Sequence, residues 1–269
     1  MTLAELFPDE DYRFQMRFGR GQPADFFGPT SRREELLAER RRWLTSEPQT
    51  YAGLLPDGEP LLEETITAAQ HWNGFALPPS GKSAWEKCLA LGEFWEADFL
   101  LLKADAAGEI RLSGGCLCFP SSWRLSDKLG KTIEFIHGVV PELNTNLGPA
   151  IHKFLAGLKP GAASLRFNWG LSRSAELNQH PDRALPKLDG SMSLEQVWLR
   201  VEEQALVALP KSDGILFGIR LVNHPLSAIR ADQLACARLR RALATMPEPM
   251  AFYKGIAPAR ARLLELLAD

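Results

Sequence analysis

Five segments in the middle of the chain have the hydrophobic pattern of β-strands. In 163–171 the apolar residues Leu165, Phe167 and Trp169 alternate with Arg166 and Asn168, which is the period of two that a strand produces. The first two segments are apolar runs joined by a turn at Ala107-Gly108, so we expect them to form a hairpin of buried strands. The five segments are 98–103, 110–119, 163–171, 196–201 and 214–222.

Helical patterns precede, interrupt and follow these strands. Ser126 and Asn146 are suitable capping residues, so we expect one helix over 126–137 and another over 146–158. Further helices are predicted at 31–45, 61–70 and 83–92 and in most of the last forty residues, with a break at 247–249. This order predicts an α+β fold with an antiparallel sheet. We expect a single domain over 1–269, with a helical N-terminal wrap (1–95), a sheet core (96–225) and C-terminal helices (226–269).

Charge and composition narrow the classes of partner. The chain has 31 Lys and Arg against 33 Asp and Glu and no basic stripe, so we do not expect nucleic acid as a partner. No apolar run approaches the roughly 20 residues of a membrane span. The acidic start of the chain lacks the pattern of a secretory signal, so we expect a cytoplasmic protein without a membrane partner. The four cysteines are too few and too irregularly spaced for an iron–sulfur cluster or a disulfide framework.

The most unusual position in the pattern is His137. Leu129, Ile133, Ile136 and His137 follow one another at helical spacing, which places the imidazole on the apolar face of the helix predicted over 126–137. An imidazole in such a place is a hydrogen-bonded core residue, a general base or an axial ligand of a metal. Spacing alone favours the core residue.

A second candidate site follows the strand predicted at 196–201. Arg200, Glu202 and Gln204 recur at every second residue, which aligns a cation, a carboxylate and an amide on one face if the strand continues. That face is either the solvated side of an edge strand or part of a polar pocket. The same two alternatives hold for Arg166 and Asn168.

Short motifs follow one another along most of the chain and carry a resemblance to a known family. They are Glu96–Leu102, Cys118–Trp123, Lys128–Gly130, Ile136-His137, Val140-Pro141, Arg166–Trp169, Leu199–Gln204, Leu209-Pro210, Ile215–Arg220 and Tyr253–Gly255. Their order and number are specific, and together they resemble the haem-dependent oxidative N-demethylase family. The turn Gly138–Glu142 departs from the pattern of that family, in which approximately Ala-Pro-Val-Pro-Gly is expected.

The resemblance implies a PAS-like antiparallel sheet that binds haem b, in an oxidoreductase subunit of the monooxygenase type. Such a subunit activates dioxygen and oxidatively N-demethylates a small secondary amine such as dimethylamine, with release of formaldehyde. Because the chain carries no flavin or iron–sulfur motif, the electrons are expected from a separate reductase subunit. The alternatives are a non-catalytic PAS-like sensor that binds haem or a small ligand, and a relative that holds no cofactor.

The resemblance also implies site residues. His137 in the Ile-His motif is expected to be the metal ligand, coordinating the haem iron axially. Glu202 and Gln204 are expected to be the catalytic residues that orient the amine or bound oxygen. The cations expected to pair with the haem propionates are Lys128, Arg166 and Arg200, and the side chains expected to wall the macrocycle are Trp123 and Trp169.

Overall fold

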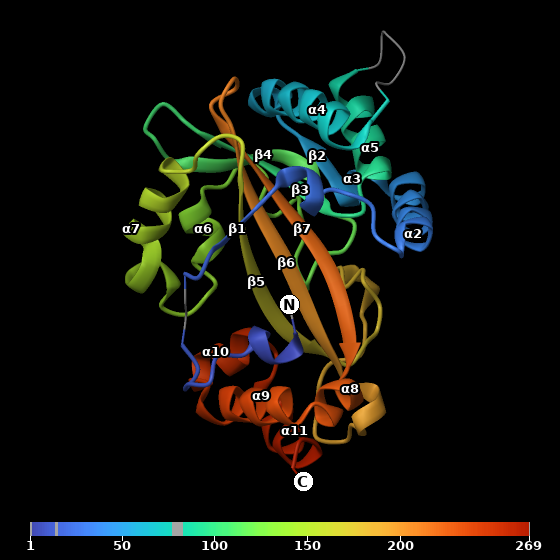
Figure 1. Ribbon diagram of the computed structural model, residues 1–269, viewed down its shortest axis with the longest axis vertical. Helices are drawn as coiled ribbons and strands as arrows, with labels where there is room; N and C mark the ends of the chain where they lie inside the picture. Colours follow the sequence, from blue (N-terminus) through green and yellow to red (C-terminus); the bar gives the residue numbers. More distant parts are fainter. Residues whose placement is uncertain (1, 14–15, 77–82, 269) are drawn as a thin grey trace.

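The computed structural model describes residues 2–13, 16–76 and 83–268. Its centre is a seven-stranded open sheet in which neighbouring strands are antiparallel (Figure 1). The strand order is β1-β5-β6-β7-β3-β4-β2. The bounds in that order are Gly19–Gly21, Ala163–Ser172, Trp198–Leu209, Gly214–Pro225, Asp98–Ala104, Ile110–Cys116 and Ala52–Leu54. The α+β fold with an antiparallel sheet is therefore confirmed.

All five predicted strands are present, and two short ones were not predicted. β6 ends at Leu209 rather than at Val201, so Glu202 and Gln204 lie on the strand as their period requires. β1 and β2 were missed because three-residue strands carry no readable period. They lie in the segment predicted to be a helical wrap, and they form the two edges of the sheet.

The helices predicted before the sheet are α2 (Arg33–Ser46), α4 (Glu59–Asn73) and α5 (Ala84–Phe94). With the short α1 (Pro23–Phe26) and α3 (Pro48–Tyr51), they gather at one end of the molecule, beside β2, β3 and β4 (Figure 1). A buried ion pair ties them to the sheet. Arg40 of α2 donates to Oδ1 of Asp98 at 2.6 Å and to the carbonyl of Gly92 in α5 at 2.7 Å.

The prediction of a helix over 126–137 is wrong for the first half of that range. α6 covers Ile133–His137, and Thr132, not Ser126, caps it by accepting from the backbone N–H of Phe135. Before it, Gly130 takes a left-handed conformation (φ 77°) and donates to the carbonyl of Leu112 in β4. This pairing with a distant strand displaces the first turns of the predicted helix.

The next helix, α7, covers Leu143–Ala156 and starts before the predicted cap Asn146. Its N-cap is Glu142, whose φ is 58°. α6 and α7 are joined by the turn at 138–142 and lie together beside the β5 side of the sheet (Figure 1).

The C-terminal helices form the other end of the molecule (Figure 1). They are α8 (Leu226–Ala231), α9 (Gln233–Thr245), α10 (Glu248–Tyr253) and α11 (Arg260–Leu266), and the predicted break falls between α9 and α10. Their apolar faces build a second hydrophobic cluster with Leu6 and Phe7 of the N-terminal segment. In the part of the chain that the structure describes, no helix has the length and apolar character needed to cross a membrane.

Candidate functional site

A cavity of about 420 Å³ lies between the sheet and the elements that cover its β5–β6 side. α6, α7, the N-terminal segment and the end of α10 provide its other walls. This volume is in the range of small-molecule sites, roughly 300–1,000 Å³. The lining residues that matter below are His137 from α6, Arg166, Asn168 and Trp169 from β5, Gln204 from β6, and Lys254 after α10.

His137 is half-buried at the C-terminal end of α6 and lines this cavity. Burial, together with the positive charges of Arg166 and Lys128 and the nearby His152, lowers the pKa of the imidazole to about 4. The imidazole is therefore neutral near pH 7. It also borders a second, smaller cavity of about 340 Å³ between α6 and α7, where His152 lies.

The polar residues of β5 and β6 share one covered face of the sheet. Arg166 lies opposite Gln204, Asn168 opposite Glu202 and Gly170 opposite Arg200. β6 lies between β5 and β7, so the alternative of a solvated edge strand is wrong. The period of two correctly placed these side chains on one face, and the tertiary structure covers that face.

Glu202 organises this face by hydrogen bonds. Its Oε1 accepts from the hydroxyl of Ser121 at 2.7 Å. Its Oε2 accepts from the amide groups of Gln204 at 2.9 Å and Asn168 at 3.2 Å. Glu202 itself is not among the residues that line the cavity, whereas both amide residues are. The carboxylate therefore positions the two amide groups from outside the cavity lining.

This arrangement fixes what Asn168 and Gln204 offer to a ligand. A side-chain amide has an NH₂ group that donates and an oxygen that accepts. Each NH₂ group uses one of its two N–H bonds to donate to Glu202, so the oxygens Oδ1 of Asn168 and Oε1 of Gln204 remain as acceptors, together with the second N–H of each amide. The sheet side of the cavity thus suits a ligand that donates N–H or O–H hydrogen bonds.

Lys254 is a cavity residue to which the sequence analysis assigned no role. Its Nζ donates to the carbonyl of Trp169 at 2.6 Å and lies 5.1 Å from the centre of the Trp169 ring. Burial lowers the pKa of this ammonium group to about 8. The motif Tyr253–Gly255 was the available signal, but a motif counted toward a resemblance does not say where its lysine points.

Arg200 was predicted to pair with a propionate, and the structure places it outside the cavity lining. It is 4% exposed, and its guanidinium donates to the carbonyls of Leu177 at 2.6 Å and Phe119 at 2.8 Å and to the hydroxyl of Ser121 at 2.8 Å. It also donates to the carbonyls of Glu176 and Pro120. These contacts hold two loops against β6.

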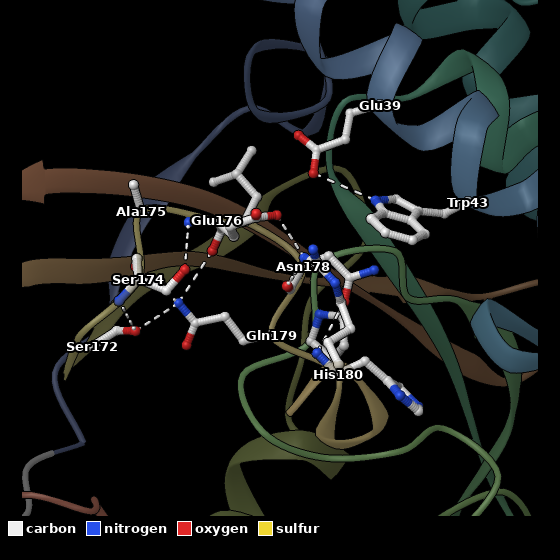
Figure 2. A network of polar contacts seen from close by, with 12 residues as sticks. Glu39, Trp43, Ser172, Ser174, Ala175, Glu176, Asn178, Gln179 and His180 are labelled. Atoms are coloured by element: carbon white, nitrogen blue, oxygen red, sulfur yellow. Dashed lines mark hydrogen bonds and ion pairs between the residues drawn. The ribbon is translucent and has the colours of Figure 1, made fainter. Parts of the chain in front are cut away.

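The loop around 176–177, to which Arg200 donates, is also held by hydrogen bonds within the loop itself. Figure 2 shows the side chain of Gln179 turned toward Ser172, Ser174 and Glu176, to which its amide donates at 2.9, 3.3 and 3.1 Å. In the same loop the backbone N–H of His180 donates to the side-chain oxygen of Asn178 at 2.9 Å. The hydrogen bonds of Arg200 and those within the loop therefore form one structural network.

Two further predicted residues, Trp123 and Lys128, lie beside the cavity and not in its lining. The Nζ of Lys128 stands 4.3 Å from the centre of the Trp123 ring. Lys128 is still close enough to act on the pKa of His137, as noted above. Of the eight predicted site residues, the cavity therefore brings together His137, Arg166, Trp169 and Gln204, with Glu202 directly behind them.

The donor set of the cavity fits a haem group. It provides one neutral imidazole, the half-buried guanidinium of Arg166 and extensive apolar walls, and a haem asks for an axial ligand, cations for its propionates and apolar contact for its ring. Across residues 2–13, 16–76 and 83–268 there is no cluster of three or more His, Cys, Asp or Glu side chains arranged to hold a metal ion. In the cavity lining, the candidate metal ligand is the imidazole of His137.

Comparison with known families agrees with these features. A family model described as haem-dependent oxidative N-demethylase, alpha subunit-like, matches residues 48–264. The match includes β2 to β7, the helices α6 and α7 with His137 and His152, and Lys254. It covers well over half of the 269 residues. The chain therefore belongs to the haem-dependent oxidative N-demethylase alpha subunit-like family.

Proposed function

We propose that this protein is the haem-binding subunit of a monooxygenase that removes a methyl group oxidatively from a small secondary amine. The observation that carries the proposal is the pairing, in one cavity, of a neutral imidazole with two side-chain amides that Glu202 anchors through their NH₂ groups, so that their oxygens remain as acceptors. The first feature suits a haem iron, and the second suits the N–H group of an amine.

His137 is the proposed axial ligand, and Arg166 the proposed partner of a propionate. Arg166 has no hydrogen bond to another described residue, and its guanidinium stands 5.8 Å from the centre of the Phe18 ring. Trp169 is the proposed wall of the macrocycle. When bound, haem supplies the redox chemistry with dioxygen that amino-acid side chains lack.

Asn168 and Gln204 are the proposed amine-binding residues. Their oxygens accept from the amine, and Glu202 behind them holds both amides in the accepting orientation. The carboxylate also supplies a negative charge close to a cationic amine. We therefore assign Gln204 to direct contact with the substrate and Glu202 to positioning.

The fold and the family description support the remaining parts of the proposal. The five long strands are arranged second, first, fifth, fourth, third in chain order, with α6 and α7 inserted between the second and third, which is the arrangement expected of a PAS-like core. The family is named for an alpha subunit. We accordingly propose a separate reductase subunit as the source of electrons.

Haem titration of the purified protein tests the first part. We expect a Soret band on addition of haem to the wild type and its loss or shift in His137→Ala. The matched control is His152→Ala, which removes the histidine of the neighbouring cavity and is expected to keep the band. If only His152→Ala loses the band, the iron ligand lies on α7 and not on α6. If the wild type takes up no haem, the proposal of haem binding is wrong.

Turnover separates the enzyme from the sensor. With haem, oxygen and a supplied reductant, we expect formaldehyde from dimethylamine and none from an amine that lacks a methyl group. Haem binding without formaldehyde from any small methylamine would instead support a sensor that uses the same cavity.

A further inference from the structure

The cavity contains two cations whose hydrogen-bonding capacity is not filled by the protein. Arg166 makes no hydrogen bond to a described residue, and the ammonium group of Lys254, which has three donors, makes one, to the carbonyl of Trp169. No carboxylate of the described residues forms an ion pair with either. Half-buried cations without carboxylate partners are costly unless a ligand supplies the counter-charge.

The two cations also act on each other. The positive charge of Arg166 lowers the pKa of Lys254, so the groups are close enough for their repulsion to matter. The negative charge of Glu202 raises the pKa of both Arg166 and Lys254. The two oxygens of Glu202, however, already accept hydrogen bonds from Ser121, Asn168 and Gln204. An anion entering the cavity would relieve the repulsion and fill the free donors.

The three groups line one cavity but come from different elements. His137 comes from α6, Arg166 from β5 and Lys254 from the end of α10, at the C-terminal end of the molecule (Figure 1). Arg166 acts on the pKa of both His137 and Lys254.

We propose that Lys254 binds a carboxylate inside the cavity that His137 and Arg166 also line. This inference deepens the proposed function and rests on it for one identification, namely that the carboxylate is a propionate of haem. The other source of the same chemistry is a free small carboxylate. Lys254→Met is a suitable variant, because an apolar side chain replaces a cation in a largely buried place and the fold is expected to survive.

A comparison of haem with haem dimethyl ester, in which both propionates are esterified, distinguishes a contact between Lys254 and a propionate from general packing. For haem at pH 7 we expect Lys254→Met to weaken binding about 10-fold to 100-fold, which is the range for a hydrogen bond to a charged group. For the ester we expect the wild type and Lys254→Met to bind equally. Lys153→Met, which removes an exposed lysine from α7, is the matched control and is expected to bind haem as the wild type does.

The dependence on pH provides a readout that packing alone would not change. The charges that face Lys254 are Glu202 and Arg166, and the neighbouring Tyr12 and Tyr253 have pKa values raised by burial. Because the pKa of Lys254 is about 8, its charge is present below that pH and is lost above it. Haem affinity of the wild type should therefore fall as the pH rises above 8, by at most tenfold per unit, and this fall should be absent in Lys254→Met.

Titration of the haem-free protein with propionate ion keeps this inference separate from haem binding. If the wild type takes up no haem but binds propionate ion, and Lys254→Met does not, the proposed function fails and the carboxylate site stands as a site for a free carboxylate. If Lys254→Met binds haem and propionate ion as well as the wild type does, the inference is wrong. Equal weakening of haem and its dimethyl ester would likewise overturn it.

Discussion

At the residue scale, Glu202 shows how a position outside the cavity lining sets the chemistry inside it. The carboxylate holds the amide groups of Asn168 and Gln204 so that their oxygens face the ligand. Hydrogen bonds to a charged acceptor are roughly twice as strong as neutral ones, so the orientation is well defined. The preference for an N–H donor thus depends on a residue that we do not expect to touch the substrate.

We expect Glu202→Gln to raise the KM for dimethylamine about tenfold with a smaller change in kcat, because each amide is then free to turn its NH₂ group toward the substrate. Steady-state formaldehyde release measures both constants, and the Soret band shows that haem is retained. Glu203→Gln is the matched control, since Glu203 lies on the opposite face of β6. An equal rise in KM for Glu203→Gln would show that the effect is one of net charge alone.

Lys254 should also affect stability. Its pKa is about 8 in the folded protein and 10.5 in the unfolded chain, so between these values the unfolded state binds the extra proton and stability rises with pH. The difference between these two pKa values corresponds to about 3 kcal/mol. Relative to Lys254→Met, the wild type should gain up to that amount between pH 8 and pH 10.5 in urea unfolding. Parallel stability curves for the two proteins would contradict this assignment.

At the scale of elements, the turn between α6 and α7 positions His137. Gly138 ends α6, and Glu142 begins α7 in a left-handed conformation that non-glycine residues rarely adopt. The family pattern expected at this turn has glycine where this chain has Glu142. A glycine would suit this place, because the backbone of this chain has a positive φ there.

We therefore expect Glu142→Gly to increase the free energy of unfolding by about 1 kcal/mol, the usual cost of a side chain in this conformation. Chemical denaturation measures the change. Glu134→Gly in the first turn of α6 is the opposite control, and it should lower stability by about 1 kcal/mol. If both glycines destabilise the protein, strain at position 142 is not the reason for the family pattern.

At the scale of the whole molecule, buried arginines join segments that are far apart in the chain. Arg40 links α2 and α5 to β3, and Arg200 links β6 to the loops at 119–121 and 176–177. Each guanidinium donates to buried carbonyl groups, and that of Arg40 also pairs with the buried carboxylate of Asp98. These contacts hold together the sheet face on which the cavity is built.

Arg200→Met should therefore lower the free energy of unfolding by about 3 kcal/mol or more, because several buried carbonyls lose their donor together. Arg230→Met, at an exposed position in α8, should stay within about 0.5 kcal/mol of the wild type. Denaturant unfolding compares the two. If Arg200→Met keeps its stability and loses haem affinity, the residue pairs with a propionate after all.

Much of the fold was predictable from local pattern. The five long strands were recognised because alternation and long apolar runs are properties of consecutive residues, and the helices before and after the sheet for the same reason. The first half of the helix expected before His137 was not, because Gly130 pairs with Leu112 in β4 and no local pattern records that contact. The short edge strands were missed because they depend on the partner strand that each one finds.

The five long strands, the shared face of Arg200, Glu202 and Gln204, and the chemical types available to a site could be read from the sequence. Three facts depend on the tertiary structure: which of those residues line the cavity, that Arg200 holds the loops, and that Lys254 lies against Trp169, 85 positions away. The physical reason is that the period of a strand is set by its own backbone, whereas burial and hydrogen-bond partners are set by segments that fold onto it.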